Sequence, residues 1–101
     1  MSAPADVHAE HAARGELGYT VDADGGAVWP PRVGLEWRVS AGRGVVYSTT
    51  TVRRRGEEPH NVALIDVDEG FRVMGRVDGE HAIGDEVAVR FEDSVAVWAT
   101  V

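Results

Sequence analysis

The stretch with the most conspicuous chemistry lies between two short apolar segments and reads Asp22-Ala23-Asp24-Gly25. Alternating Asp residues followed by Gly are typical of the opening of a calcium-binding loop, whose carboxylates surround the ion. Such a loop ends in a Glu at its twelfth position, and here that position is Val33. Because Asp and Gly also favour tight turns, the sequence predicts a hairpin turn here and not a calcium site.

The histidines are the next candidates for metal binding or proton transfer. His8 and His11 are three residues apart and would share one helical face, but two ligands without a third make a weak metal site. His60 and His81 fall in polar loops, without a Ser, Cys or carboxylate partner at a recognisable spacing. We therefore expect no metal ligand and no catalytic residue in this chain.

Basic side chains are concentrated in one place, Arg53-Arg54-Arg55. A solvated loop that keeps the molecule soluble is the simpler interpretation. The functional interpretation is an anion-binding site, because guanidinium groups bind phosphates or a partner's carboxylates bidentately. The acidic cluster at Asp66, Asp68 and Glu69 is expected to be a solvent-exposed hairpin turn.

The overall charge limits the classes of partner. The chain of 101 residues carries ten Arg, no Lys and seventeen acidic residues, giving a formal net charge of −7. A nucleic-acid-binding protein needs a basic face, since phosphate contacts supply most of its affinity. The acidic balance makes nucleic acid the less favoured partner, and the apolar content of 44% predicts one folded domain.

Composition also bears on compartment and metal content. The chain has no Cys, which excludes disulfides and thiolate metal ligands and fits a reducing compartment. Its N-terminal stretch is acidic and His-containing where a signal peptide needs a basic start and an apolar run. No segment approaches the roughly eighteen apolar residues of a membrane span. We expect a cytoplasmic protein without a membrane contact.

The N-terminal third is predicted to hold two small units. Residues 1–16 form a leader that is either disordered or a short helix ended by Gly15, and such a short helix needs a surface to dock against. Residues 17–34 suit a hairpin with arms at 18–21 and 27–29. Pro30 and Pro31 then end the strand because neither can donate to a β-ladder.

The remaining residues, 35–101, alternate in the manner of β-strands. We expect a long bent strand over 35–52, broken by the Gly42-Arg43-Gly44 stretch, and further strands near 62–67, 71–77, 86–93 and 95–101. Five strands without a helix between them predict an all-β fold, and a closed barrel would remove the exposed edges. An OB-fold barrel is the first hypothesis and an SH3-like barrel the second.

The tryptophans are assigned by position. Trp37 and Trp98 fall on predicted strands, and one of them is expected to fill the barrel interior. Trp29 precedes two prolines in a region with little core of its own. It is expected either to pack on the barrel or to lie in an interface, where Trp is enriched.

Three segments in order, GRGVVYSTTTV, PHNVALIDVDEGFRVMGRV and IGDEVAVRFED, resemble the OB-fold half of the acyl-CoA-associated zinc-ribbon/OB-fold proteins, also called domain of unknown function thirty-five. The resemblance spans about residues 42–93. Members of that family carry a ribbon before the barrel, with a pattern like C-x-x-C-G-x-x-x-x-P-P-R and a second Cys pair.

The resemblance implies that this chain has lost the zinc ligands of the ribbon. Aligned on Pro30-Pro31-Arg32, the first Cys pair falls at Val21 and Asp24, and the second pair has no counterpart between Val33 and Trp37. One carboxylate without thiolates cannot hold a structural zinc, so zinc is not expected. The order of the hairpin must then come from apolar packing, by Tyr19, Val21, Val28 and Trp29.

What the resemblance implies about function is an accessory subunit and not an enzyme. Such proteins associate with thiolase-like or ketosynthase-like enzymes, or with hot-dog hydratases, and help position or channel acyl-CoA thioesters. Arg53, Arg54 and Arg55 are then the candidates for contacts to CoA phosphates or to acidic residues of the partner, with CoA shared at the interface and no tightly bound cofactor. Self-association into a homo-oligomer is a further alternative for the partner.

Two alternatives remain open at this stage. An OB barrel can bind single-stranded nucleic acid through stacking aromatic side chains and a basic groove. The chain could also be a small enzyme acting on a thioester, which requires a general base that the sequence does not reveal.

Overall fold

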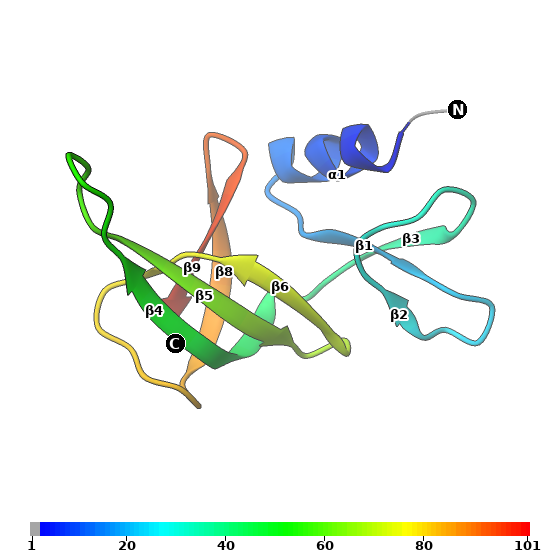
Figure 1. Cartoon of the computed structure of the whole chain (residues 1–101). Helices are drawn as coiled ribbons and strands as arrows, with labels where there is room; N and C mark the ends of the chain where they lie inside the picture. Colours follow the sequence, from blue (N-terminus) through cyan, green and yellow to red (C-terminus); the bar gives the residue numbers. More distant parts are fainter. Residues whose placement is uncertain (1–2) are drawn as a thin grey trace.

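The computed structural model describes residues 3–101 of the chain, which form one helix and two β-sheets (Figure 1). The molecule is elongated, with principal extents of 41 × 28 × 21 Å, because the two sheets lie side by side. The elements in chain order are α1 (Pro4–Ala13), β1 (Gly18–Val21), β2 (Ala27–Val28), β3 (Glu36–Val39), β4 (Arg43–Val52), β5 (His60–Val67), β6 (Phe71–Gly75), β7 (Val77–Asp78), β8 (Glu86–Glu92) and β9 (Val95–Thr100).

The smaller sheet, called the ribbon sheet below, has the strand order β2-β1-β3. Its β1–β2 hairpin is the one predicted from the sequence, with Gly25 at φ +83° in the turn, where a side chain would be strained. The leader also forms the expected short helix, since Pro4 occupies the first turn of α1.

One strand expectation is wrong. The segment that begins at Leu35 is not the start of a long bent barrel strand, because β3 pairs antiparallel with β1 in the ribbon sheet, Trp37 opposite Thr20. The barrel begins with β4, after the turn at Gly42, whose φ is +75°. Alternation along a strand shows which residues share a face but does not show which strand is the neighbour.

The larger sheet is an OB-type barrel with strand order β6-β5-β4-β8-β9-β7. The two edge strands, β6 and β7, are halves of one segment separated only by Arg76. The first half pairs antiparallel with β5 and the second half pairs parallel with β9. The sheet must therefore curl until its two edges meet, which gives five barrel strands, as the sequence predicted. The all-β OB-fold prediction is confirmed.

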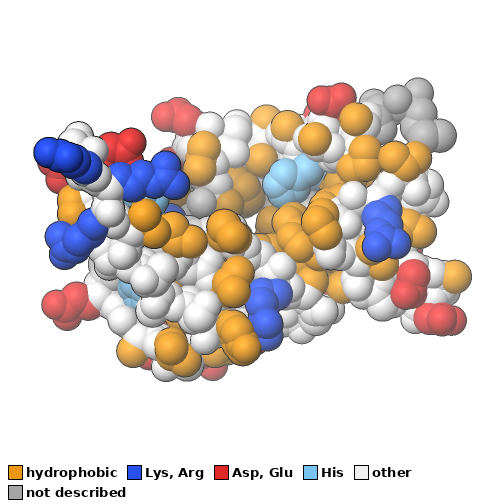
Figure 2. All heavy atoms as spheres, viewed as in Figure 1, with side chains coloured by type: hydrophobic (Ala, Val, Ile, Leu, Met, Phe, Trp, Pro, Cys, Tyr) orange, Lys and Arg blue, Asp and Glu red, His pale blue; other side chains and the backbone are white. Residues whose placement is uncertain are grey.

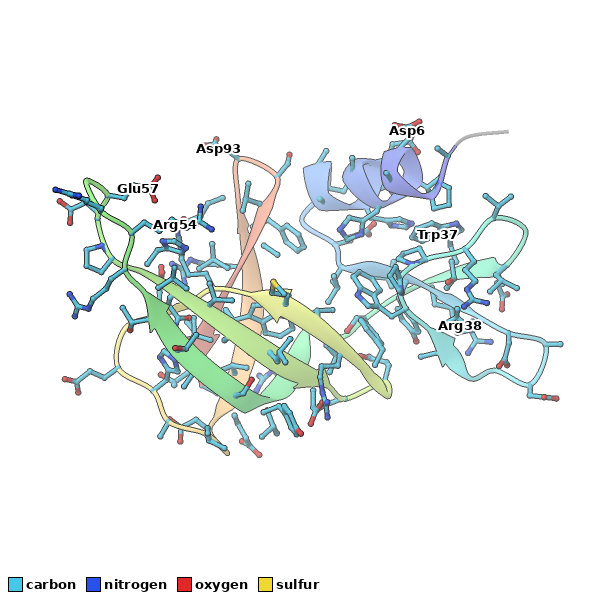
Figure 3. All side chains as sticks on the ribbon, in the orientation of Figure 1. Asp6, Trp37, Arg38, Arg54, Glu57 and Asp93 are labelled. Atoms are coloured by element: carbon cyan, nitrogen blue, oxygen red, sulfur yellow. The ribbon has the colours of Figure 1, made fainter. Side chains whose placement is uncertain are left out.

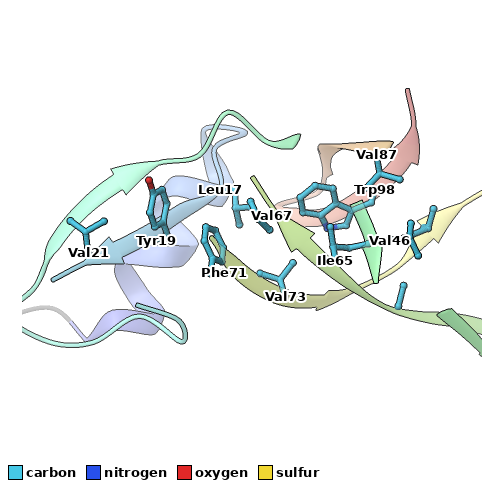
Figure 4. Close-up of a cluster of buried hydrophobic side chains, with 12 residues drawn as sticks. Leu17, Tyr19, Val21, Val46, Ile65, Val67, Phe71, Val73, Val87 and Trp98 are labelled. Atoms are coloured by element: carbon cyan, nitrogen blue, oxygen red, sulfur yellow. The ribbon is translucent and has the colours of Figure 1, made fainter. Parts of the chain in front are cut away.

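A single hydrophobic core runs through both sheets (Figure 4). Trp98 fills the barrel with 1% of its surface exposed, which confirms that one of the two strand tryptophans lies inside, while Trp37 is only half-buried. At the junction, Phe71 of β6 stacks on Tyr19 and on Trp29, with ring centroids 4.8 and 5.1 Å apart. Trp29 thus packs on the barrel, one of the two outcomes expected for it.

Gly44 lies where the barrel leaves no room for a side chain, and it gives a test of the fold. A Cβ at this position would lie 2.6 Å from the carbonyl oxygen of Asp66 and 2.8 Å from a methyl group of Ile65. We expect Gly44→Ala to lower the free energy of unfolding by about 1–3 kcal/mol, because the neighbouring strand must move. Urea denaturation followed by tryptophan fluorescence measures this.

Gly26→Ala is the matched control for that substitution. Its Cβ would meet only the flexible carboxylate of Asp22, at 3.1 Å, so its effect should be well below that of Gly44→Ala. Equal effects for the two variants would contradict the register of β4 and β5.

Candidate functional site

The three arginines predicted to bind anions lie at the tip of the β4–β5 loop. All three side chains are exposed, and the loop is turned by a hydrogen bond from the Glu57 amide to the Arg54 carbonyl oxygen, 3.1 Å. None of the ion pairs found over residues 3–101 includes Arg53, Arg54 or Arg55. The loop projects from the end of the barrel far from the ribbon sheet (Figure 3). Its guanidinium groups can therefore meet an external anion.

The other arginines differ, because carboxylates already neutralise half of the ten. On the barrel, Arg76 and Arg90 share the carboxylates of Asp78 and Glu92 in a closed ring, with contacts from 2.6 to 3.6 Å. Hydrogen bonds to Glu92 and then Asp78 raise the pKa of Arg90 above its usual value. The remaining pairs are Arg14–Glu16, Arg38–Glu36 and Arg72–Asp66.

A mixed apolar face covers the outside of β4, β5 and β6 (Figure 2). Met74 is 74% exposed and Tyr47 is 49% exposed, at a bulge where the β4–β5 register shifts. The Arg72 guanidinium lies 3.5 Å from the centre of the Tyr47 ring and 2.6 Å from Asp66, whose hydrogen bond raises the pKa of Arg72. Tyr, Met and Arg are the side chains enriched in protein interfaces. We call Tyr47, Leu64, Arg72 and Met74 the outer face.

The histidines of α1 hold the helix on the ribbon sheet. His8 packs edge-on against Trp29, with ring centroids 5.6 Å apart, and His11 stacks on Trp37 at 5.5 Å. The absence of a side chain at Gly18 makes room for the His11 ring, since a Cβ there would lie 2.5 Å from it. The shared helical face predicted for the two histidines is real, and it serves packing.

His11 also takes part in a polar cluster at the end of the helix. Its Nδ1 lies 3.0 Å from Glu16 Oε1, and the same carboxylate oxygen accepts from Arg14 Nε at 3.1 Å. The hydrogen bonds from His11 and Arg14 lower the pKa of Glu16. This contribution to stability is present above the ordinary Glu pKa and is lost as the pH falls through the lowered value.

The acidic clusters serve turns and the junction between the sheets. Asp22 Oδ1 accepts hydrogen bonds from the amides of Asp24 and Gly26, both at 2.9 Å, so it closes the predicted hairpin turn. Glu69 does more than the sequence suggested. Its carboxylate accepts from the buried Ser40 hydroxyl at 2.6 Å and from the Ala41 amide at 2.9 Å, which ties the barrel to the segment leaving the ribbon sheet.

A hydroxyl partner for His81, which the sequence did not reveal, lies on β4. His81 Nδ1 lies 2.9 Å from the Gly79 carbonyl oxygen and must donate to it, so Nε2 accepts from the Thr49 hydroxyl at 2.6 Å. Asn61 donates to the same Thr49 oxygen at 2.8 Å and accepts from the Val77 amide. This chain of hydrogen bonds, from Asn61 through Thr49 to His81, is called the relay below, and it fixes the 79–85 loop to the barrel.

Thr49→Val tests that relay. The substitution removes the hydroxyl, which leaves His81 Nε2 without its partner in a half-buried site and leaves the Asn61 amide only its bond to the Thr50 carbonyl oxygen, so we expect a loss of about 1–3 kcal/mol. Thr50→Val, at the exposed neighbouring position, should change the stability much less. Thermal denaturation of both variants measures the difference, and a harmless Thr49→Val would show that the relay is not needed.

No ligand set for a metal stands out among residues 3–101, where no three His, Asp or Glu side chains converge. If apolar packing alone orders the ribbon, a chelator should leave the molecule unchanged. We therefore expect the thermal midpoint to be the same with and without EDTA, and metal analysis of the purified protein to give far less than one zinc per chain. A midpoint lowered by EDTA would contradict this.

A search of the described helices for membrane spans finds none of sufficient length and hydrophobicity. The fold places the chain among small OB-fold proteins that carry a three-stranded ribbon and a helix before the barrel. A family model, described as the C-terminal OB-fold domain of ChsH2, matches residues 37–92. The chain belongs to this family, and the resemblance drawn from the sequence is confirmed.

Two solved structures share the fold over nearly the whole chain. The Ltp2-ChsH2(DUF35) aldolase is 20% identical, with a TM-score of 0.77 over 99% of this chain and 96% of that one. A DUF35-family protein of unknown function from Sulfolobus solfataricus is 12% identical, with a TM-score of 0.76 over 100% of this chain and 87% of that one. No curated protein matches the chain significantly.

Proposed function

We propose that the chain is a non-catalytic accessory subunit that binds an enzyme of acyl-CoA metabolism, of the thiolase, ketosynthase or hot-dog hydratase type, and helps to position acyl-CoA thioesters. The observation that carries this proposal is the likeness to the Ltp2-ChsH2(DUF35) aldolase, whose name joins a DUF35 protein to Ltp2. The likeness includes the ribbon as well as the barrel, since it extends over 99% of this chain.

The polar groups of the described chain support an accessory role. The Thr49–His81 pair has the donor and acceptor of a nucleophile and its base, but the Thr49 oxygen also accepts from Asn61. The acidic residues Asp22, Asp66 and Glu69 are engaged in a turn, an ion pair and a junction. These groups have roles in holding the fold, which supports an accessory function.

Two surfaces are suited to an enzyme partner. The outer face is the convex side of a barrel sheet, which cannot enclose a small molecule but can fit a complementary protein surface. The loop with Arg53, Arg54 and Arg55 is an exposed basic extension, and it would contact CoA phosphates or carboxylates of the partner. Ion pairs occupy five of the other seven arginines, so this loop is the main basic cluster, and an extended nucleic-acid groove is hard to assemble.

The proposal is tested with purified thiolase-type and aldolase-type enzymes encoded near the gene for this chain. We expect one of them to form a stable complex, measured by biolayer interferometry, and to turn over acyl-CoA faster in that complex. Replacing Arg53, Arg54 and Arg55 together by Gln should weaken binding about tenfold and reduce its salt dependence, because charge contacts are lost.

The matched variant replaces the same three arginines by Lys. It keeps the charge but loses the planar fork, so a bidentate contact would be restored only in part. No complex with any such enzyme, or turnover of acyl-CoA by the chain alone, would contradict the accessory role. Salt-dependent binding of a labelled oligonucleotide at micromolar concentration would favour the nucleic-acid alternative instead.

A further inference from the structure

The ribbon sheet has two outer strands, and β3 is the longer of them. Strand β3 lies at the end of the order β2-β1-β3, and over residues 3–101 no strand pairs with its outer side. Edge strands of this kind expose backbone N–H and C=O groups that can pair with another strand. The side chains along β3 decide which strand would fit.

The hydrogen-bonding pattern shows which backbone groups point outward. The Ser40 amide donates to the Leu17 carbonyl oxygen at 2.9 Å, so Leu17 and Ser40 form a hydrogen-bonded pair at the end of the β1–β3 ladder. Because such pairs alternate in antiparallel sheets, Arg38 and Glu36 also direct their backbone groups toward β1. The backbone groups of Leu35, Trp37 and Val39 therefore face the open side.

The charged side chains of β3 are arranged so that two antiparallel copies of the strand place opposite charges against each other. Glu36 and Arg38 flank Trp37 and form an ion pair of 3.2 Å within the chain, yet their side chains are 67% and 50% exposed. In an antiparallel pair centred on Trp37, Glu36 of one copy lies opposite Arg38 of the other, and the reverse holds two residues along. These are non-hydrogen-bonded positions, with Cα atoms about 4.5 Å apart, where opposite charges attract most strongly.

We propose that β3 is a self-association edge, through which two copies of this chain pair antiparallel around Trp37 to form a continuous six-stranded sheet. The outward backbone groups of Leu35, Trp37 and Val39 are those that such a register requires. The pair has two-fold symmetry, so each contact occurs twice, as in an isologous dimer. This proposal does not depend on the enzyme-partner function.

The helices leave room for this pairing. Helix α1 packs against β1, with His11 reaching across to Trp37. In the paired sheet the two β1 strands would be three strand spacings apart, about 14 Å. This separation exceeds the roughly 8–10 Å between packed helices, so the two copies of α1 would stand beside each other without overlap.

Charge on an edge strand often prevents pairing, and that is the competing explanation for Glu36 and Arg38. Protection by charge works when like charges meet, as with lysines on an edge. Several registers satisfy the outward backbone groups; the one centred on Trp37 brings unlike charges together, whereas those centred on Glu36 or Arg38 place like charges opposite each other, so the charges select the Trp37 register. The net charge of −7 on each copy opposes association, but it is largely screened beyond about 8 Å at physiological ionic strength.

The strength of the pair is limited by its length. Four residues of strand bury far less than the roughly 800 Å² per partner of a stable complex. We therefore expect a weak dimer, with a dissociation constant in the range of tens to hundreds of micromolar. Sedimentation velocity from about 10 µM to 1 mM covers this range.

Charge reversal at the two exposed positions tests the register. Glu36→Arg and Arg38→Glu each place like charges opposite each other, so each variant alone should dimerise about tenfold more weakly than the original chain. An equimolar mixture of the two should form a heterodimer, and the double variant Glu36→Arg/Arg38→Glu should dimerise like the original chain.

The controls change the same charge at the far end of the barrel, where Glu57 and Arg54 lie (Figure 3). Glu57→Arg and Arg54→Glu should leave the dissociation constant within about twofold. Circular dichroism would verify that every variant is folded. A monomer at 1 mM, a dimer indifferent to Glu36→Arg, or a double variant that fails to recover would each overturn the proposal.

Discussion

The stacking of Phe71 between Tyr19 and Trp29 is the interaction on which the rest of the structure depends. A ribbon sheet with so few residues cannot form a core of its own, and this one has no thiolates with which to bind a structural zinc. It is ordered because Tyr19 and Val21 are buried in the same cluster as the barrel side chains. In this chain the ribbon is therefore an apolar extension of the barrel core.

The helix α1 and the junction between the sheets also hold the ribbon sheet in place. His8 and His11 of α1 contact Trp29 and Trp37. Glu69 binds Ser40 and Ala41, in the segment that leaves the ribbon sheet. Each of these contacts joins residues from different elements. The ribbon is therefore positioned relative to the barrel by packing and hydrogen bonds, and the outer face and the arginine loop keep a defined geometry with respect to it.

Much of the fold follows from the sequence because β-strand alternation and turn residues are local signals. The Asp22 turn, the barrel strands and the buried Trp98 could be predicted in this way. The neighbour of β3 could not, since alternation at Glu36 to Val39 is the same whether the strand joins the barrel or the ribbon. The Thr49–His81 pair joins residues 32 apart, and no local spacing reveals such a contact. The three arginines were conspicuous as a run, but their distance from the ribbon became known only from the structure.

The shared core has a consequence for the way the molecule comes apart. Removal of the ribbon would leave Phe71, now 7% exposed, facing water together with neighbouring valines of the barrel. The barrel and the ribbon should therefore melt in one cooperative transition, and proteolysis would find no stable smaller fragment to release. The ribbon is then part of one cooperative unit and not a separately folding module.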